Sequence, residues 1–466
     1  MVHIKIEDIL NSLDDIKFVG HSNSMQRVVS FYTLDSREVS TENSSSSLYF
    51  AHKGDRVDGF SFVEDLINVG VKCFACSKDY ETLCVEYLDK NDDLVFLLAS
   101  DVILLLQKLA ANFIKRTNYK RIAVTGSNGK TTTKEMLYSI LSERYKTYKT
   151  WGNLNSDIGL PLSILRAEGD EEYAVFEVGI SYIGEMSLLS EILHPEIVII
   201  TNISYAHMQA FENLEIVASE KGKIITKDTQ IVILNDTCPY HSNLREIANS
   251  RSPGINISYF DFGRLQIRSF SLLNEKFFYD FTYKGCNYSI LLPGRHNILN
   301  AISCINLAIL LGLSENEIRQ GLMKADFQKG RAELIRLKDY LVLNDSYNGN
   351  LGSFMALKEM VLDLDIKGKK FIILGSFKEL GNFSYKTHKT VMQEIILMDF
   401  DKVFLIGEEF QEIKRLENLT LNNLYYFNNF EDFIDCFVKN LESQCFIAIK
   451  GSRSNRLERI LSYIKD

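Results

Sequence analysis

The chain has 466 residues, of which 46% are hydrophobic and 24% are charged, and it contains only 5 prolines. This composition is typical of a folded globular protein, and at roughly 150 residues per domain the length predicts about three domains. The 52 basic and 61 acidic residues give a net charge of −9, which disfavours the broad attraction that nucleic-acid binding requires. We therefore expect no nucleic-acid partner, and any phosphate to be bound locally.

Neither the N-terminus nor the most apolar stretch indicates a membrane protein. The start of the chain, MVHIKIEDIL, lacks the basic start, apolar run and cleavage site of a secretory signal. Residues 94–106 are interrupted by Ser100 and Asp101 and are too short to cross a bilayer, so they predict a strand followed by a core helix. We expect a cytoplasmic protein without membrane insertion.

Cys73 and Cys76 form a CxxC without a second pair, which predicts buried free thiols.

Short apolar runs alternate with helical patterns from about residue 120 onward, which is typical of α/β folds with parallel sheets. Strands are expected at residues 122–125, 174–178, 197–203 and 231–234, and, after a helical stretch at 298–313, at 341–343, 371–374, 403–406 and 446–449. The chain is thus predicted to be α/β with three domains. These are a small mixed α/β substrate domain at 1–105, a central P-loop-type parallel-sheet ATPase domain at 106–325 and a C-terminal Rossmann-like α/β domain at 326–466.

A glycine-rich segment between a predicted strand and helix has the context of a phosphate-binding loop. Its backbone N–H groups and the helix N-terminus would face phosphates, the Lys130 ammonium would add a cation, and the Thr131 hydroxyl would bind Mg²⁺. The usual GxxxxGK[ST] spacing would need glycine at position 124, which is Val124, so the loop is a shortened GxxGKT form. A glycine-rich turn with a solvated lysine is the alternative, but the flanking strand and helix favour ATP binding. The predicted ATP-binding residues of the loop are Gly126, Ser127, Asn128, Gly129, Lys130, Thr131 and Thr132.

Polar residues that follow the other central strands should converge on this loop, because ligands of open α/β sheets bind beyond the carboxyl ends of the strands. Glu177 lies at the end of an apolar strand, where a carboxylate is costly unless it is paired or binds a metal. His207 follows the next strand, although a loop histidine alone is more often structural. Lys221 falls on the apolar face of a predicted helix, so it either extends to the helix edge or is modified into an anion that holds a metal.

Together these residues resemble the Mur ligases of peptidoglycan synthesis over nearly the whole chain, and especially the members that add D-alanyl-D-alanine to UDP-MurNAc-tripeptide. The shortened loop, followed by Thr-Lys-Glu, is normal in those members. KTWGNLNSDIGLP at 149–161 resembles GNxNNxxGxP, GRHNILNA at 294–301 resembles GxHNxxNA, and NDSYNGN at 344–350 resembles DDSYNAN. LGSFKELG at 374–381, His388 and KGSR at 450–453 resemble the part that faces the incoming dipeptide, and the Asp35-Ser-Arg37 and Asp58-Gly-Phe60 segments resemble a UDP-sugar motif.

The resemblance implies a set of metal and catalytic residues. Thr131 and Glu177 would bind one Mg²⁺, and His207 with a carbamylated Lys221 would bind a second. Lys221 is chosen over Lys223 as the carbamylated residue partly because Lys221 falls on the apolar face of the predicted helix. The implied catalytic residues are Lys130, Glu177, His207 and Lys221.

The resemblance also implies contacts to the nucleotide and the substrates. Asn297 would reach the adenine, Arg331 a phosphate and Asp345 the ribose, while Asn297 could also cap its helix. The substrate-binding residues are expected to be Ser36, Arg37, Asn153, Asn155, Tyr347 and Asn348.

The expected activity is ATP-dependent amide-bond formation through an acyl phosphate, by a monomer whose partners are UDP-MurNAc-tripeptide and D-Ala-D-Ala. One alternative is another Mur-type ligase that adds a single amino acid, or a folylpolyglutamate synthetase-like enzyme, but DSYNGN and the Thr-Lys-Glu after the loop argue against both. A nucleotide-dependent switch or kinase is a different class. It would leave His207, Lys221 and the third domain unexplained.

Overall fold

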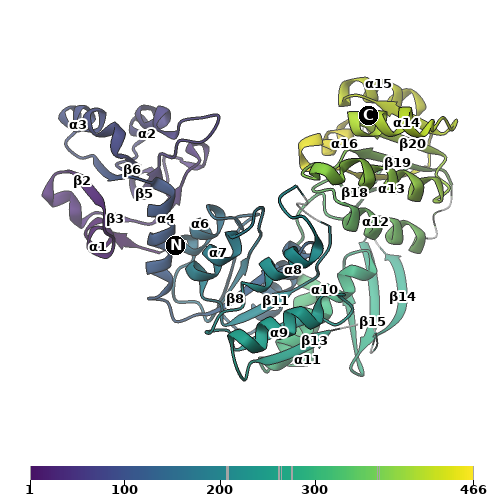
Figure 1. Ribbon diagram of the computed structural model, residues 1–466, viewed down its shortest axis with the longest axis horizontal. Helices are drawn as coiled ribbons and strands as arrows, with labels where there is room; N and C mark the ends of the chain where they lie inside the picture. Colours follow the sequence, from purple (N-terminus) through teal and green to yellow (C-terminus); the bar gives the residue numbers. More distant parts are fainter. Residues whose placement is uncertain are drawn as a thin grey trace.

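The computed structural model describes residues 2–205, 209–260, 263, 265–273, 276–364, 366 and 368–464. Helices alternate with mostly parallel strands along most of the chain, so the predicted α/β fold class is confirmed. In Figure 1 the N-terminal region lies at the upper left, the middle of the chain below it and the C-terminal region at the upper right. The three regions therefore follow one another in space as they do in sequence.

The N-terminal region contains a mixed sheet with strand order β2-β7-β6-β5-β4. Strand β2 is antiparallel to β7, and the remaining pairs are parallel. A short antiparallel pair, β1 with β3, lies beside it. The strands are β1 (Ile4–Lys5), β2 (Ile16–Gly20), β3 (Val28–Val29), β4 (Phe31–Thr33), β5 (Ser47–Phe50), β6 (Cys73–Ser77) and β7 (Val95–Ala99). The helices are α1 (Ile6–Ser12), α2 (Val63–Val69), α3 (Glu81–Lys90) and α4 (Val102–Ile114).

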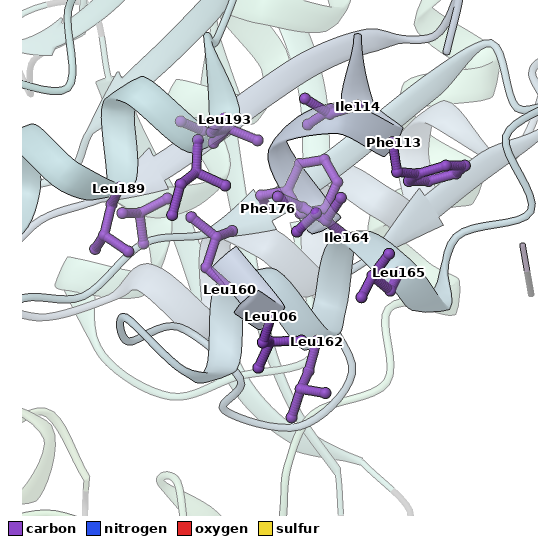
Figure 2. Close-up of a cluster of buried hydrophobic side chains, with 14 of the residues drawn as sticks. Leu106, Phe113, Ile114, Leu160, Leu162, Ile164, Leu165, Phe176, Leu189 and Leu193 are labelled. Carbon is purple, nitrogen blue, oxygen red and sulfur yellow. The ribbon is translucent and has the colours of Figure 1, made fainter. Parts of the chain in front are cut away.

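Helix α4 connects the N-terminal and central regions. It follows β7, as residues 94–106 predict, and the Asp101 side chain caps it by accepting hydrogen bonds from the backbone N–H groups of Ile103 and Leu104. The predicted boundary at residues 105 and 106 falls inside this continuous helix. Figure 2 shows that its side chains pack against those of α6 and α7 and against Phe176 of β10 in the central region. The same helix also contacts β5, β6 and β7 of the N-terminal sheet. The division into domains stays a prediction.

The central region is built on a parallel sheet with strand order β13-β12-β11-β8-β10-β9. Its strands are β8 (Lys120–Thr125), β9 (Thr147–Lys149), β10 (Tyr173–Glu177), β11 (Ile197–Ile200), β12 (Ile231–Asn235) and β13 (Asn256–Phe260). Its helices are α5 (Lys130–Leu141), α6 (Gly159–Arg166), α7 (Glu185–Leu193), α8 (Leu214–Gly222), α9 (His241–Arg251), α10 (Arg295–Leu310) and α11 (Glu315–Lys324). The buried strands have apolar runs because helices cover both faces of the sheet.

Two sequence predictions for the central region need correction. The strand predicted at 197–203 ends at Ile200, because the following residues bond to the phosphate loop, where the Ser127 backbone N–H donates to the Asn202 carbonyl at 3.0 Å. The helix predicted at 298–313 begins at Arg295 and ends at Leu310. The antiparallel sheet of β14 (Leu265–Leu273), β15 (Lys276–Tyr283) and β16 (Cys286–Ile290) was not predicted.

The C-terminal region contains a second largely parallel sheet, with strand order β17-β18-β22-β19-β20-β21, in which only the edge pair β17 and β18 is antiparallel among the described strands. Its strands are β17 (Glu333–Leu337), β18 (Tyr340–Asp345), β19 (Lys370–Gly375), β20 (Lys402–Ile406), β21 (Leu424–Phe427) and β22 (Phe446–Lys450). Its helices are α12 (Leu351–Asp363), α13 (Ser384–Ile396), α14 (Glu408–Glu417), α15 (Phe430–Asn440) and α16 (Ile460–Ile464). The strands predicted in this region are confirmed.

Cys73 and Cys76 are buried free thiols on β6, as predicted. Burial raises the pKa of Cys73 to about 11.

In the part of the chain that the structure describes, no helix combines the length and apolar character needed to cross a bilayer.

Candidate active site

The predicted phosphate loop connects β8 to α5, at the carboxyl edge of the central sheet. Gly126 and Gly129 both have positive φ, of 146° and 83°. A Cβ on Gly126 would lie 1.9 Å from Oγ1 of Thr201, and one on Gly129 would lie 2.6 Å from Oδ1 of Asn300. Only glycine fits at these two positions, and the backbone N–H groups of the loop therefore remain at the N-terminus of α5.

Lys130 is the first residue of α5, and its ammonium folds over the loop. Nζ donates to the Gly126 carbonyl at 2.9 Å and to the Ser127 carbonyl at 3.4 Å. Burial lowers the pKa of Lys130, Glu177 opposes that shift and the positive charge of Arg331 adds to it. Phosphate oxygens at this position would be stronger acceptors than the two carbonyls.

A cavity of about 470 Å³ opens beside the loop and brings together residues from both the central and the C-terminal regions. Of the predicted site residues, those in its wall are Ser127, Asn128, Gly129, Lys130, Thr131, Thr132, Asn153, Asn155, Glu177, Asn297, Arg331, Asp345, Tyr347 and Asn348. The described wall does not include Gly126, Lys221, Ser36 or Arg37. Most of the residues predicted from separate motifs thus converge on one cavity.

Glu177 is 1% exposed and is held from two sides. Its backbone N–H donates to Oγ1 of Thr150 at 3.0 Å, and its Oε1 accepts a 2.7 Å hydrogen bond from Nδ2 of Asn155. Its Oε2 is buried and accepts no hydrogen bond within the described structure. A buried carboxylate oxygen without a donor is costly unless a cation binds it.

Lys221 lies on α8 and is 3% exposed, as the helical pattern predicts, whereas Lys223 forms an ion pair with Glu220. Burial lowers the pKa of Lys221 well below its usual value, and the charge of Lys130 lowers it further. His207, the other predicted ligand of the second metal, lies outside the described residues. Among the described residues, no group of three or more His, Cys, Asp or Glu side chains could hold a metal ion.

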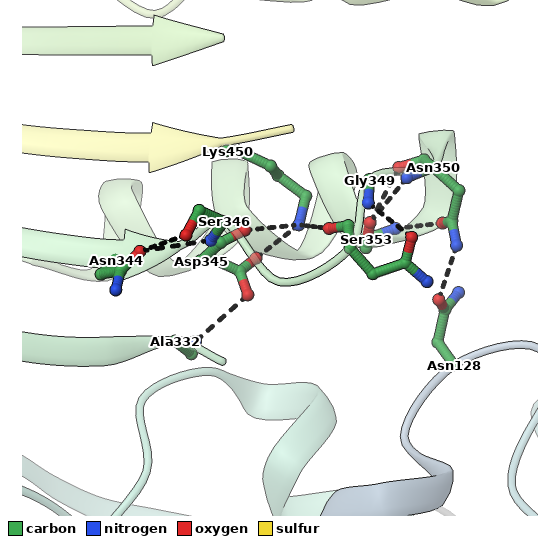
Figure 3. A network of polar contacts seen from close by, with 10 residues as sticks. Asn128, Ala332, Asn344, Asp345, Ser346, Gly349, Asn350, Ser353 and Lys450 are labelled. Atoms are coloured by element: carbon green, nitrogen blue, oxygen red, sulfur yellow. Dashed lines mark hydrogen bonds and ion pairs between the residues drawn. The ribbon is translucent and has the colours of Figure 1, made fainter. Parts of the chain in front are cut away.

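The C-terminal wall of the cavity is a polar network, which Figure 3 shows. Lys450 is fully buried, and its Nζ donates to Oδ2 of Asp345 at 2.5 Å and to the Asn348 carbonyl at 3.1 Å. The Asn350 side chain caps α12 and its Nδ2 donates to Oδ1 of Asn128 in the phosphate loop at 2.9 Å. The C-terminal region therefore contacts the loop directly.

Two further side chains complete the walls. The Arg331 guanidinium lies over the Tyr347 ring, 4.1 Å from its centroid. Asn297 is buried within the first turn of α10, and its Nδ2 donates to the Pro293 carbonyl at 2.6 Å. The N-cap position of α10 is Gly294, so the interpretation of Asn297 as a helix N-cap is wrong.

Three family models match consecutive parts of the chain. Residues 28–113 match the Mur ligase family catalytic domain, residues 124–308 the Mur ligase middle domain and residues 330–453 the Mur ligase glutamate ligase domain. The chain is also 64% identical, over 100% of both chains, to UDP-N-acetylmuramoyl-tripeptide--D-alanyl-D-alanine ligase of Borreliella burgdorferi. The chain belongs to the Mur ligase family.

Solved structures of Mur ligases share its architecture. A crystal structure of MurF from Acinetobacter baumannii is 27% identical, with a TM-score of 0.78, and covers 94% of each chain. MurF ligase from Thermotoga maritima in complex with ADP is 24% identical, with a TM-score of 0.76, and covers 93% of this chain and 97% of its own. The second likeness supports the fold alone.

Two predicted substrate residues of this Mur ligase lie in the N-terminal region. Ser36 and Arg37 form a short 3₁₀ turn after Asp35, and Arg37 donates to both carboxylate oxygens of Asp35, at 2.8 and 2.6 Å. The Arg37 side chain is 87% exposed. Its guanidinium is therefore open to solvent beside an intact ion pair.

Two chemically unusual residues of this Mur ligase, Lys134 and His296, were not predicted from the sequence. Lys134 is a fully buried lysine on α5, and His296 lines the cavity with a buried Nδ1 that has no hydrogen-bond partner in the described structure. Burial lowers the pKa of His296 to about 4. Lys134 lies four residues after Lys130 on the same helix, a spacing that places both on one face and was the available signal.

Proposed function

We propose that this cavity is the active site of an ATP-dependent ligase that joins D-alanyl-D-alanine to UDP-N-acetylmuramoyl-tripeptide. The observation that carries the proposal is the 64% identity, over the full length of both chains, to the Borreliella burgdorferi ligase of that name. The cavity has the parts that such a reaction needs, because the phosphate loop forms one wall and polar residues of the C-terminal sheet form another.

The chemistry requires activation of the tripeptide carboxylate. An unactivated carboxylate does not exchange its oxygen for an amine at neutral pH, because oxide is a poor leaving group. A carboxylate oxygen attacks the γ-phosphorus of ATP, the bond to the β,γ-bridging oxygen breaks, and an acyl phosphate and ADP result. The amine of the dipeptide then attacks the acyl carbon, inorganic phosphate leaves and the nitrogen loses a proton.

The residues of the cavity support this reaction mainly by position and charge. The loop N–H groups and the Lys130 ammonium lie where the β- and γ-phosphates would bind at the N-terminus of α5. Arg331 also lines the cavity, where a second cation would face the transferred phosphoryl group. Asn297 and Asp345 are proposed to bind the adenine and the ribose.

Mg²⁺ fits one place in this wall. Glu177 contributes a buried oxygen without a hydrogen-bond donor, and Thr131 contributes a hydroxyl on the adjacent first turn of α5. Carboxylate and hydroxyl oxygens, together with phosphate oxygens, suit Mg²⁺. When bound, Mg²⁺ supplies positive charge that stabilises the negative charge developing on the phosphoryl oxygens.

A second Mg²⁺ is proposed at His207 and Lys221. Because Lys221 is buried and its pKa is lowered, a share of the amine is neutral and can react with carbon dioxide. The resulting carbamate would carry oxygen ligands in place of an ammonium. The second metal position requires carbamylation of Lys221, whereas the first position requires no modification.

The remaining substrate contacts are also proposals. Asn153, Asn155, Tyr347 and Asn348 line the cavity and are proposed to contact the reacting ends of the substrates. Ser36 and Arg37 are proposed to bind the UDP part of the nucleotide sugar. The cytoplasmic location and the monomeric state expected from the sequence stay predictions.

One experiment tests the reaction. The protein is incubated with ATP, Mg²⁺ and UDP-MurNAc-tripeptide, together with D-Ala-D-Ala or a single amino acid, and phosphate release and product mass are measured. We expect phosphate and product in equal amounts with the dipeptide alone. Turnover with a single amino acid but not with the dipeptide would point to another Mur-type ligase. A rate of phosphate release that is the same with and without either acceptor would point to a nucleotide-dependent switch.

A further inference from the structure

Lys134 is a buried charged residue for which the proposed reaction has no role. It lies on α5, it is 0% exposed and it does not line the cavity within the described structure. Burying a lysine ammonium is costly unless acceptors surround it. The contacts of this side chain therefore indicate what the charge does.

The Lys134 ammonium joins the phosphate-loop helix to the loop at residues 150–155. Its Nζ donates to the Thr150 carbonyl at 2.9 Å and to the Gly152 carbonyl at 3.0 Å. It also forms an ion pair with Glu135 at 3.0 Å. The loop thus has two of its carbonyls bound to α5 by one side chain.

The same loop holds Glu177 in place. Oγ1 of Thr150 accepts from the Glu177 backbone N–H, and Nδ2 of Asn155 donates to Glu177 Oε1. The Asn155 carbonyl in turn accepts from the Gly179 backbone N–H at 2.8 Å. A shift of the loop would therefore move the carboxylate and the end of β10 together.

Lys134 also faces Glu177 directly, but at a longer distance. Nζ lies 3.8 Å from Glu177 Oε2, which is within reach of charge attraction and beyond a hydrogen bond. The ammonium thus balances the charge of the carboxylate and leaves Oε2 without a donor. This arrangement holds the carboxylate in place while Oε2 accepts no hydrogen bond within the described structure.

We propose that Lys134 is a positioning residue, which ties the 150–155 loop to the phosphate-loop helix so that Asn155 and Glu177 keep their alignment with the bound phosphates. The inference rests on the proposed function, because it assigns Glu177 to the reacting end of the cavity. Lys134 itself is not part of the described cavity wall. Replacement of Lys134 should slow the reaction without weakening the binding of ATP to the phosphate loop.

The test uses a reporter that the chain already contains. Trp151 is the only tryptophan of the protein and lies between the two residues whose carbonyls Lys134 binds. Time-resolved fluorescence anisotropy of the full chain without ligand therefore reports the local motion of this loop. Thermal unfolding is measured alongside to establish that each variant is folded.

The variant is Lys134→Met, and the matched control is Lys149→Met. Lys149 forms an ion pair with the same Glu135 and lies 4.4 Å from the centroid of the Tyr138 ring. It makes no described side-chain contact with the loop carbonyls or with Glu177. The control thus removes a neighbouring charge of the same cluster without releasing the loop.

In Lys134→Met we expect the amplitude of the fast depolarisation of Trp151 to rise roughly twofold. We expect kcat to fall roughly tenfold to a hundredfold, because a small misplacement of reacting groups has an effect of that order, with KM for ATP changed less than about threefold. Lys149→Met should match the wild type in both measurements. If Lys134→Met does not fold, Lys134→Gln, which keeps one donor, is measured in the same way.

The proposal is overturned if Trp151 is no more mobile in Lys134→Met than in Lys149→Met, whatever the activity of Lys134→Met. It is also overturned if the loop becomes mobile while kcat stays at the wild-type value. Wild-type turnover with the dipeptide is measured separately, so failure of the proposed reaction is distinguishable from failure of the positioning role.

Discussion

The ion pair of Asp345 and Lys450 allows a quantitative prediction about the cavity wall. Lys450 is 0% exposed and Asp345 is 16% exposed, and their side chains meet at 2.5 Å (Figure 3). Replacing Lys450 by Met leaves a largely buried carboxylate whose remaining described donor is the Ala332 backbone N–H at 3.1 Å. Breaking a buried pair from one side costs roughly 3 to 5 kcal/mol, and partial access of water to Asp345 favours the lower end.

The double variant Asp345→Asn with Lys450→Met should be far less destabilised. The amide keeps an oxygen for the Ala332 N–H and carries no charge, so no isolated ion remains in the interior. We expect a total cost below about 2 kcal/mol, and hence a coupling energy of more than about 1 kcal/mol between the two sites.

Hydrogen exchange measured by mass spectrometry on peptides that cover β18 and β22 is the suitable assay, because it reports the opening of this sheet alone. A cost of about 3 kcal/mol corresponds to exchange that is roughly a hundredfold faster or more. The Lys149→Met variant, which alters a distant ion pair, should leave these peptides unchanged. The reasoning is refuted if Lys450→Met accelerates exchange less than about fivefold, or if the double variant is as unstable as the single one.

Replacing Lys130 by Met should lower kcat by roughly a hundredfold to a thousandfold with little change in thermal stability, because its charge acts on the transferred phosphate; a decrease below about tenfold in phosphate release would contradict this role. The pKa of His296 is about 4 in the folded protein against 6.5 as its ordinary value, so the unfolded chain binds more protons between these values. The contribution of neutral His296 to the free energy of unfolding is therefore complete above about pH 6.5 and is lost as the pH falls towards 4. Between pH 7.5 and pH 5 the free energy of unfolding should decrease by about 2 kcal/mol. Urea unfolding at the two pH values should show a smaller difference in His296→Gln, and an equal difference would count against the assignment. Lys221→Ala should lose activity that short-chain carboxylic acids partly restore, and an absence of restoration would argue against the carbamate.

The local patterns of the sequence predicted the parts of the site that neighbouring residues determine. Gly126, Gly129 and Lys130 lie between an apolar run and an amphipathic helix, and the structure places them between β8 and α5 as expected. The apolar face of α8 likewise predicted the burial of Lys221. These predictions succeed because backbone geometry and side-chain periodicity depend on residues only a few positions apart.

Two predictions failed, one because a distant segment bonds to the backbone and one because of the local backbone conformation. The strand expected through residue 203 ends at Ile200, because the Asn202 carbonyl accepts a hydrogen bond from the Ser127 backbone N–H of the phosphate loop. Asn297 looked like a helix N-cap but lies inside the first turn of α10, since the chain turns at Gly294 with a positive φ. The first outcome depends on residues about 75 positions apart, whereas the second depends on the local conformation of Gly294.

The sequence by itself determined the α/β class, the phosphate loop and the residue types available for the chemistry, because each follows from periodicity and spacing along the chain. Only the tertiary structure decided which of these groups meet. Asn350 donates to Asn128 across 222 positions of the sequence, and Lys134 faces Glu177 through the packing of α5 against β10. Such contacts depend on how whole helices and sheets pack, because packing alone brings together groups that are far apart in the sequence and excludes water from them.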